Sequence, residues 1–230
     1  LHRRAYRETS LLLDLLVQAQ GRLTAIAKGV RRKPGHAPEP FTRYRIALAG
    51  RGSLKTVASL EMEQQFRLAG DALYAGMYVN ELLMRTSRPS ESLDGMFEAY
   101  GGVIWDLGAD GSDVEPALRR FELHLLHALG YELSFDRDGD SGSRLEPGVM
   151  YHFEPGKGLC SGRHQAGSQF RGSTLLNIAT GNFRSREARR AAKCILREAL
   201  EPILGYRPLK SRELLLARSL ADGVQERAAT

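Results

Sequence analysis

The feature that most constrains this chain is a change in the spacing of its apolar residues near Leu68. Before this point, apolar residues come in short runs and alternations separated by turns; after it, they recur every three or four residues. The first spacing is typical of β-strands, and the second of helices that bury one face. We therefore expect an α+β chain in which a small β-rich domain precedes a helical domain.

The β-rich segment contains four stretches with strand character, which are 11–17, 22–30, 43–48 and 54–60. Within 43–48, apolar and charged residues alternate as in a half-buried strand. Short strands joined by glycine turns indicate a small barrel of the OB type over 1–65. The chain opens with Leu1 rather than Met, so we expect residues to precede it. The first strand of the barrel should then be incomplete and end at Leu1-His2.

Helical spacing recurs in five later stretches, which are 68–82, 91–107, 114–129, 185–203 and a short 211–220. Asp113 is suited to cap the third of these helices, and Gly130 to end it. Residues 131–172 are rich in Gly and Asp, with weak strand signals around Tyr151 to Phe153, and we interpret them as an irregular subdomain or a mobile excursion. The expected domains are an OB domain (1–65), a helical domain (66–130), an irregular zinc-less insertion (131–180) and C-terminal helices that pack on the helical domain (181–230).

Charge is segregated along the chain. Residues 1–65 contain 12 Lys/Arg against 5 Asp/Glu, residues 66–179 contain 10 against 16, and residues 180–230 contain 11 against 6. Such segregation creates local positive fields suited to a polyanion. No apolar stretch is long enough for a membrane helix, and we expect no membrane partner. Two cysteines are too few for a disulfide scaffold, so we expect a cytoplasmic protein.

Catalytic and cofactor motifs are weak in this sequence. The 156–158 Gly-Lys-Gly segment lacks the spacing of a phosphate loop, and no G-x-S-x-G motif occurs. His124 and His127 have no third metal ligand nearby, and Cys160 with His164 has no sequence context that makes a nucleophile. We therefore expect a non-enzymatic protein without metal or cofactor, and leave an enzyme built on Cys160 or on the glycine loop as a remote alternative.

The basic residues of the N-terminal segment make a better case for function, because they fall in loops and at strand ends. The candidate DNA-binding residues are Arg3, Arg4, Arg7, Lys28, Arg31, Arg32, Lys33, Arg51 and Lys55. Cations in such positions track phosphates, which predicts salt-sensitive binding that is independent of base sequence. Tyr6, Phe41 and Tyr44 are either core residues or base-stacking platforms. The arginines of 186–197 are candidates for a second DNA surface.

A series of short motifs gives the chain a family resemblance. They are Tyr6-Arg-Glu-Thr-Ser-Leu-Leu-Leu-Asp14, Gly21-Arg-Leu23, Ala27-Lys-Gly-Val-Arg31, Pro40-Phe-Thr42, Gly50-Arg-Gly52, Tyr78-Val-Asn-Glu-Leu-Leu83, Pro116-Ala-Leu-Arg-Arg-Phe-Glu122, Leu129-Gly-Tyr131 and Pro208-Leu-Lys-Ser-Arg-Glu-Leu214. Their order and their spread over almost the whole chain resemble the RecO family of recombination mediators.

This resemblance implies a protein of DNA repair and homologous recombination that binds single- and double-stranded DNA and anneals complementary strands. It also implies work with RecR, binding to the acidic C-terminal tail of single-stranded-DNA-binding protein, and loading of recombinase on DNA covered by that protein. Such a protein would associate with the nucleoid during repair. Some members carry a four-cysteine zinc site, but this sequence lacks those cysteines. Between Arg32 and Phe41 the chain is shorter than its relatives, so this basic loop is either trimmed or mobile and missing from the sequence.

Arg119 and Arg120 lie in the motif where the family's tail-binding arginine occurs. An arginine beside an apolar helix groove suits a peptide with acidic residues and a free carboxylate. The alternative is a solvated Arg120 paired with Glu115 or Glu122. For the whole chain, the competing function is an RNA- or ribosome-associated OB-fold protein, because basic loops alone do not distinguish RNA from DNA.

Overall fold

The computed structural model describes residues 1–32, 37–162, 167–205 and 207–214, which fall into two compact units. Unit 1 comprises Leu1–Val114 together with the segment that begins at Pro208, and unit 2 comprises Glu115–Arg207. Unit 2 is therefore inserted into the chain of unit 1. This division cuts across the 66–130 helical domain expected from the sequence, because the helix that begins at Val114 belongs, from Glu115 onward, to unit 2.

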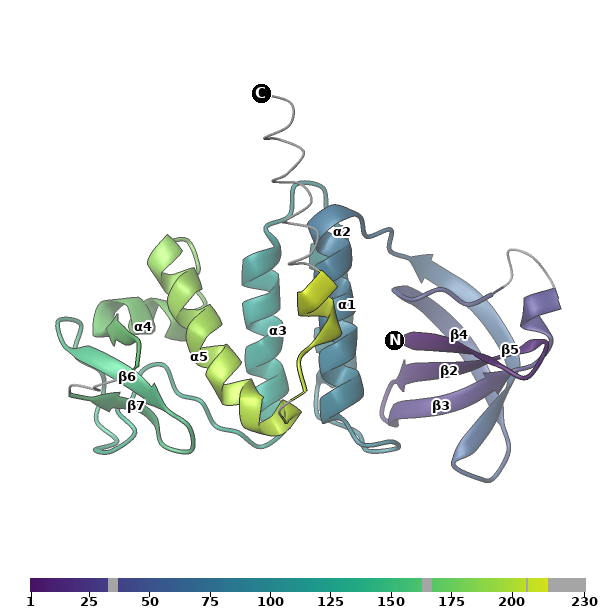
Figure 1. Cartoon of the computed structure of the whole chain (residues 1–230), viewed down its shortest axis with the longest axis horizontal. Coiled ribbons are helices and arrows are strands. Elements are labelled where there is room, and N and C mark those ends of the chain that lie inside the picture. The colour runs from purple at the N-terminus through teal and green to yellow at the C-terminus, as the bar shows by residue number, and fades with distance from the viewer. Residues whose placement is uncertain (33–36, 163–166, 206, 215–230) are drawn as a thin grey trace. The chain divides into compact units, whose positions relative to one another are not determined.

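Unit 1 begins with a five-stranded sheet (Figure 1). Its strands are β1 (His2–Tyr6), β2 (Ser10–Val17), β3 (Gly21–Ala27), β4 (Thr42–Ala49) and β5 (Leu54–Gln65), with the short 3-10 helix η1 (Val30–Arg32) after β3. The order across the sheet is β1-β2-β3-β5-β4, and only the β3–β5 pair is parallel. Among the described residues no ladder joins β1 to β4. This arrangement confirms the predicted OB-type fold, which is a partly open Greek-key barrel.

The start of the sheet differs from the expectation. The first strand does not end at Leu1-His2; it runs from His2 to Tyr6 and pairs with β2 over its whole length. The sequence pattern was misleading here because three of its residues are His2, Arg3 and Arg4, which carry no apolar alternation. Strand β2 supplies the core instead, with Leu11 and Leu13 packed against Ala27 and the partly buried Val57.

Two helices complete most of unit 1, namely α1 (Gly70–Thr86) and α2 (Met96–Gly108). Helix α2 begins five residues later than predicted, because Ser90 and Gly95 have positive φ angles of 62° and 61° that interrupt a helix. The guanidinium of Arg22 on β3 donates to the hydroxyl and the carbonyl of Ser87, at 3.2 and 2.9 Å, and so ties the sheet to the end of α1. A Cβ at Gly21 would lie 1.9 Å from the carbonyl oxygen of Glu91, so this approach requires glycine.

The segment 208–214 returns to unit 1 and packs on α1. The Glu81 carboxylate accepts hydrogen bonds from the backbone N–H of Lys210 (3.0 Å) and from the N–H and hydroxyl of Ser211 (2.9 and 2.7 Å). Arg212 lies over the ring of Tyr78 at 5.3 Å, and the Leu209 side chain is buried. Residues 210–214 are helical, which agrees with the start of the predicted 211–220 helix; the rest of that prediction lies outside the described residues.

Unit 2 contains three helices and a second sheet. The helices are α3, which starts at the boundary (Val114–Ala128), α4 (Gly172–Ala179) and α5 (Arg186–Leu204). The strands β6 (Met150–Glu154), β7 (Gly158–Ser161) and β8 (Gln169–Arg171) form a sheet in the order β7-β6-β8. Ser185 caps α5 by accepting a hydrogen bond from the N–H of Ala188 at 3.0 Å.

The prediction of an irregular segment over 131–172 is wrong in its second half. The strand signal near Tyr151 is the central strand of the β6–β8 sheet, and α4 begins at Gly172. In the first half, the Asp138 carboxylate takes the place of regular pairing: it accepts from the N–H groups of Asp140, Ser141 and Ser161. The Ser141 and Ser161 hydrogen bonds, against the opposing effect of burial, lower the pKa of Asp138 to about 2. Several short hydrogen-bonded turns of this kind carry no periodic signal.

Arg119, one of the two candidate tail-binding arginines, lies on the buried face of α3. Its guanidinium lies 2.9 Å from the Glu122 carboxylate, and the two side chains are 7% and 1% exposed. This burial removes Arg119 from the surface available to a peptide. Arg120 is exposed on the same helix.

We expect Glu81→Gln to lower the free energy of unfolding by about 2 kcal/mol, because a charged acceptor of three hydrogen bonds is lost. Hydrogen bonds from Ser211 and Lys210, helped by Arg85, outweigh burial and lower the pKa of Glu81 below 4.5. The carboxylate therefore stabilises the fold above that pH and loses its effect as pH falls further. Urea unfolding of wild type and variant should differ fully at neutral pH and progressively less in acid. Glu213→Gln, on an exposed residue of the same segment, is the matched control; an equal effect of both would contradict the assignment.

We expect Arg119→Met to destabilise the protein by about 3 to 5 kcal/mol, because it leaves the Glu122 carboxylate buried without its partner. Replacing both residues, as in Arg119→Met with Glu122→Leu, should restore most of the loss. Arg120→Ala on the same helix should change stability by about 0.5 kcal/mol or less. Chemical denaturation followed by circular dichroism measures all three, and equal losses for Arg119→Met and Arg120→Ala would disprove the buried role.

Candidate nucleic-acid and peptide interfaces

Four of the predicted DNA-binding residues gather at one end of the OB-type sheet. The turn between β1 and β2 carries Arg7, and the loop with η1 carries Lys28, Arg31 and Arg32; we call these four residues the η1 cluster. Two hydrogen bonds join the turn to the loop: Arg31 N–H donates to the carbonyl of Thr9 at 3.0 Å, and its guanidinium donates to the carbonyl of Arg7 at 3.1 Å. Residues far apart in sequence thus present their cations together.

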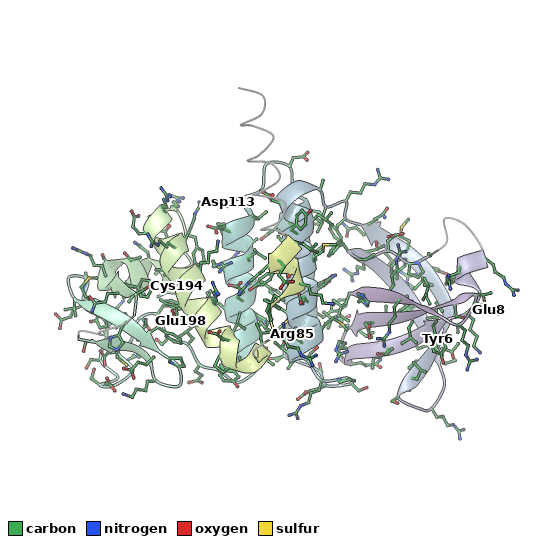
Figure 2. The ribbon with its side chains drawn as sticks, viewed as in Figure 1. Tyr6, Glu8, Arg85, Asp113, Cys194 and Glu198 are labelled. Atoms are coloured by element: carbon green, nitrogen blue, oxygen red, sulfur yellow. The ribbon has the colours of Figure 1, made fainter. Side chains whose placement is uncertain are left out.

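The η1 cluster is open to solvent. All four side chains are exposed, and Arg7 lies over the Tyr6 ring at 5.3 Å. Glu8 is an exposed carboxylate in the same turn, and Figure 2 shows it beside Tyr6 at this end of the sheet. Four cations against this one neighbouring acid favour contact with a polyanion over a neutral ligand.

The other predicted DNA-binding residues lie outside the η1 cluster and differ in their partners and exposure. Arg3 is held by the Glu39 carboxylate at 2.8 Å and by the carbonyl of Pro38 at 2.9 Å. Arg4 is exposed on β1. Arg51 lies in the β4–β5 turn, which Figure 1 shows at a different corner of the sheet from η1. Lys55 lies at the start of β5 and donates to the carbonyl of Gly50 in the same turn at 3.1 Å. Lys33 lies outside the described residues.

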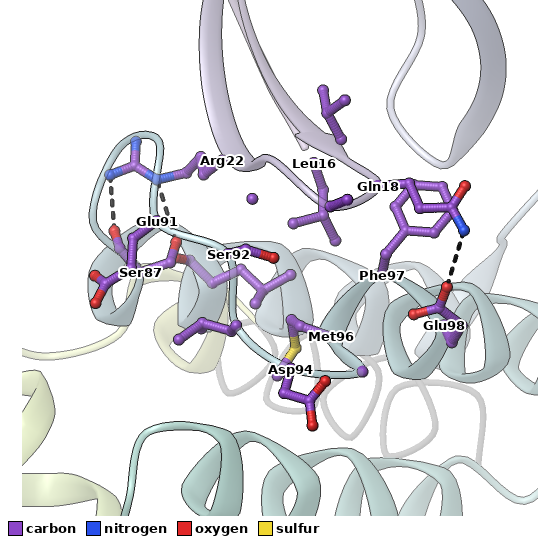
Figure 3. A pocket seen from close by; sticks show the side chains of 16 residues that line it. Leu16, Gln18, Arg22, Ser87, Glu91, Ser92, Asp94, Met96, Phe97 and Glu98 are labelled. Carbon is purple, nitrogen blue, oxygen red and sulfur yellow. Dashed lines mark hydrogen bonds between the residues drawn. The ribbon is translucent and has the colours of Figure 1, made fainter.

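A cavity of about 340 Å³ lies where the β2–β3 turn meets the loop before α2 (Figure 3). Its only cation, Arg22, is committed to Ser87. The remaining charges are the carboxylates of Glu91, Asp94 and Glu98. This cavity is therefore unsuited to a phosphate, and the DNA-binding candidates remain on the sheet.

Unit 2 carries a second basic surface, at the N-terminal end of α5. Two adjoining depressions of about 500 and 440 Å³ share Arg184 and Arg189 in their walls, and we call them together the α5 cleft. Their basic lining residues are Arg120, Arg184, Arg186, Arg189, Arg190 and Lys193, and their one acidic lining residue is Glu115. Pro116 and the largely buried Phe183 form the apolar part of the lining. The cleft combines positive charge with a small apolar area.

Local contacts hold this surface in place. The Arg189 guanidinium donates to the carbonyl of Phe183 at 2.6 Å, and Lys193 lies 3.3 Å from the Glu115 carboxylate at the start of α3. The N-terminal end of α5 adds the positive end of a long helix dipole. Sequence reasoning placed Arg120 in a partner site but did not connect it with Phe183 and Arg184. The Ser185 cap and the basic run that follows it were the available signals.

The two cysteines considered for catalysis or metal binding lie in environments that raise the pKa of their thiols. Burial, with a contribution from Asp140, raises the pKa of the Cys160 thiol to about 11, which disfavours the thiolate form at neutral pH. His164 lies outside the described residues. Cys194 lies beside Glu198 one turn later on α5 (Figure 2), and burial raises its pKa as well. Within the described residues, no three His, Cys, Asp or Glu side chains form a group that could hold a metal ion.

No helix in the described part of the chain is both long and apolar enough to cross a bilayer.

The chain matches family models and curated proteins along most of its length. The sequence model of "Recombination protein O N terminal" matches residues 1–66, and that of "Recombination protein O C terminal" matches residues 67–213. Curated relatives named DNA repair protein RecO include that of Cellvibrio japonicus, 41% identical over 222 residues that make up 93% of each chain. That of Vibrio cholerae is 39% identical over 96% of this chain and 92% of its own, and that of Erwinia tasmaniensis 40% over 93% and 89%. With both family models matched in order and relatives this similar along their length, the chain belongs to the RecO family of DNA repair proteins.

Proposed function

We propose that this protein is a non-enzymatic recombination mediator that binds single- and double-stranded DNA and anneals complementary strands. The observation that carries the proposal is the η1 cluster, where four exposed cations from two loops of an OB-type sheet lie together in a chain of the RecO family. Annealing forms no covalent bond. It requires that the repulsion between two phosphate backbones be lowered, which exposed cations accomplish.

The second part of the proposal concerns partners. The α5 cleft suits the acidic C-terminal tail of single-stranded-DNA-binding protein, because its cations complement carboxylates and its apolar patch accepts an aromatic side chain. Holding this tail brings the mediator to covered DNA, where it acts with RecR to load recombinase. The arginines of 186–197, first considered for DNA, line this cleft in part and are assigned here to the peptide.

Replacing Lys28, Arg31 and Arg32 together with Ala should reduce the slope of log K against log salt by about 2 for single-stranded DNA, since each lost phosphate contact contributes about 0.7. Fluorescence anisotropy of a labelled strand over a salt series measures the slope. Arg88→Ala, an exposed arginine of unit 1 outside the cluster, should leave it unchanged. A slope that does not move in the triple variant would place the phosphates elsewhere. Tighter binding of an RNA of the same sequence would instead favour the RNA-binding alternative.

Arg120→Ala should weaken binding of a synthetic tail peptide about tenfold, because a charge-assisted hydrogen bond to a carboxylate is lost. Isothermal titration calorimetry measures the affinity. Arg144→Ala, another exposed arginine of unit 2, is the matched control and should bind as wild type does. Amidation of the peptide's C-terminus should weaken binding to wild type more than to Arg120→Ala. Unchanged affinity in Arg120→Ala would remove this residue from the site.

A further inference from the structure

A groove of about 500 Å³ in unit 1, distinct from the η1 cluster, is lined by an unusual number of aromatic side chains. They are Phe41, Tyr44, Phe66, Phe97, Tyr100 and Trp105. Strand β4 and the residues after β5 supply one wall, and α2 supplies the other. The OB segment and α2 are separated in sequence, so no local pattern brings these rings together.

The most exposed ring of the groove is Trp105. It is 61% exposed on α2, although its helix neighbours Ile104 and Leu107 are fully buried. The Phe66 ring supports it edge-on, with centroids 6.1 Å apart and planes at 78°. Tyr100 is fixed deeper in the wall by a hydrogen bond from its hydroxyl to the Asn80 side chain at 2.8 Å. The indole of Trp105 is thereby held in place by Phe66 while much of its surface remains exposed to solvent.

The charged side chains that line the groove are Arg43 on β4 and Glu98 on α2. Arg43 and Arg45 share the single carboxylate of Glu63, at 3.4 and 3.0 Å, which leaves one net positive charge among the three. Arg43 also lies 5.9 Å from the centroid of the Phe97 ring. The Glu98 carboxylate accepts a hydrogen bond from Gln18 (Figure 3). A groove that holds both aromatic faces and a cation suits a ligand in which an aromatic ring is joined to an anion.

We propose that this groove binds an unpaired base of single-stranded DNA, with Trp105 as the stacking face and Arg43 beside the adjoining phosphate. The inference rests on the proposed DNA-binding function and deepens it. Stacking of bases on aromatic side chains tolerates any base, because each has a π-face. The bases of a duplex are already stacked on each other, so the groove distinguishes an unpaired strand from a paired one. The η1 cluster supplies charge to both kinds of DNA, and the groove adds affinity for the single strand.

The test uses the fact that Trp105 is the only tryptophan of the chain. Its fluorescence in the full-length protein should be quenched by oligothymidylate, and much less by a duplex or by a strand of equal length from which the bases have been removed. Trp105→Ala should weaken binding of oligothymidylate about tenfold without changing the salt slope, since no phosphate contact is lost. Duplex binding should be unchanged. Tyr131→Ala, an exposed aromatic residue of unit 2, is the matched control and should bind as wild type does.

Three outcomes would overturn this proposal. One is oligothymidylate binding that leaves Trp105 fluorescence unchanged, which would leave the groove for another class of partner, such as a protein. Another is wild-type affinity in Trp105→Ala, and a third is equal quenching by the abasic strand. In each case binding of DNA to the η1 cluster would persist. Failure of the proposed function itself would appear differently, as absence of DNA binding by the wild-type protein at any salt concentration.

Discussion

The Glu81 carboxylate closes unit 1 by accepting three hydrogen bonds from Lys210 and Ser211. Two motifs that lie far apart in the sequence, 78–83 and 208–214, are therefore the two sides of one contact. Arg212 lies over the ring of Tyr78 and donates to its hydroxyl, and the backbone N–H groups of the returning segment donate to Glu81. This contact explains why unit 2 is bounded on both sides by unit 1, and why a charged residue stands in the middle of an apolar helical motif.

The sequence predicted elements better than it predicted assembly. Strands β2 to β5 and helices α1, α3 and α5 were recognised because each has a regular apolar period, which is a local property. Strand β1 was misplaced because it is basic, and the β6–β8 sheet gave only a weak signal near Tyr151 because its strands are short. The assignment of α3 to a separate unit could not be read from local patterns, since unit 1 resumes only at Pro208, after all of unit 2.

In the candidate sites too, the sequence identified the residue types, whereas only the fold shows which distant residues contact each other. Basic composition identified the cations of the η1 cluster, but only the fold shows that Arg31 binds the turn of Arg7 while Arg3 is committed to Glu39. Arg119 and Arg120 are adjacent in sequence and have opposite environments, because successive side chains of an α-helix point about 100° apart around its axis. Trp105 was not considered for binding, since its ring partner Phe66 is distant in the sequence and reaches it only in the folded chain.

The insertion of unit 2 also sets an order for folding during synthesis. A chain is made from its N-terminus, and compact units fold as wholes once they have emerged. All of residues 115–207 are made before the segment that binds Glu81, so unit 2 is available to fold while unit 1 still lacks its last piece. A folded insert holds its two ends at a set separation, which lowers the entropic cost of closing so long a loop. The unit that the ribosome begins first is thus expected to be the last one completed.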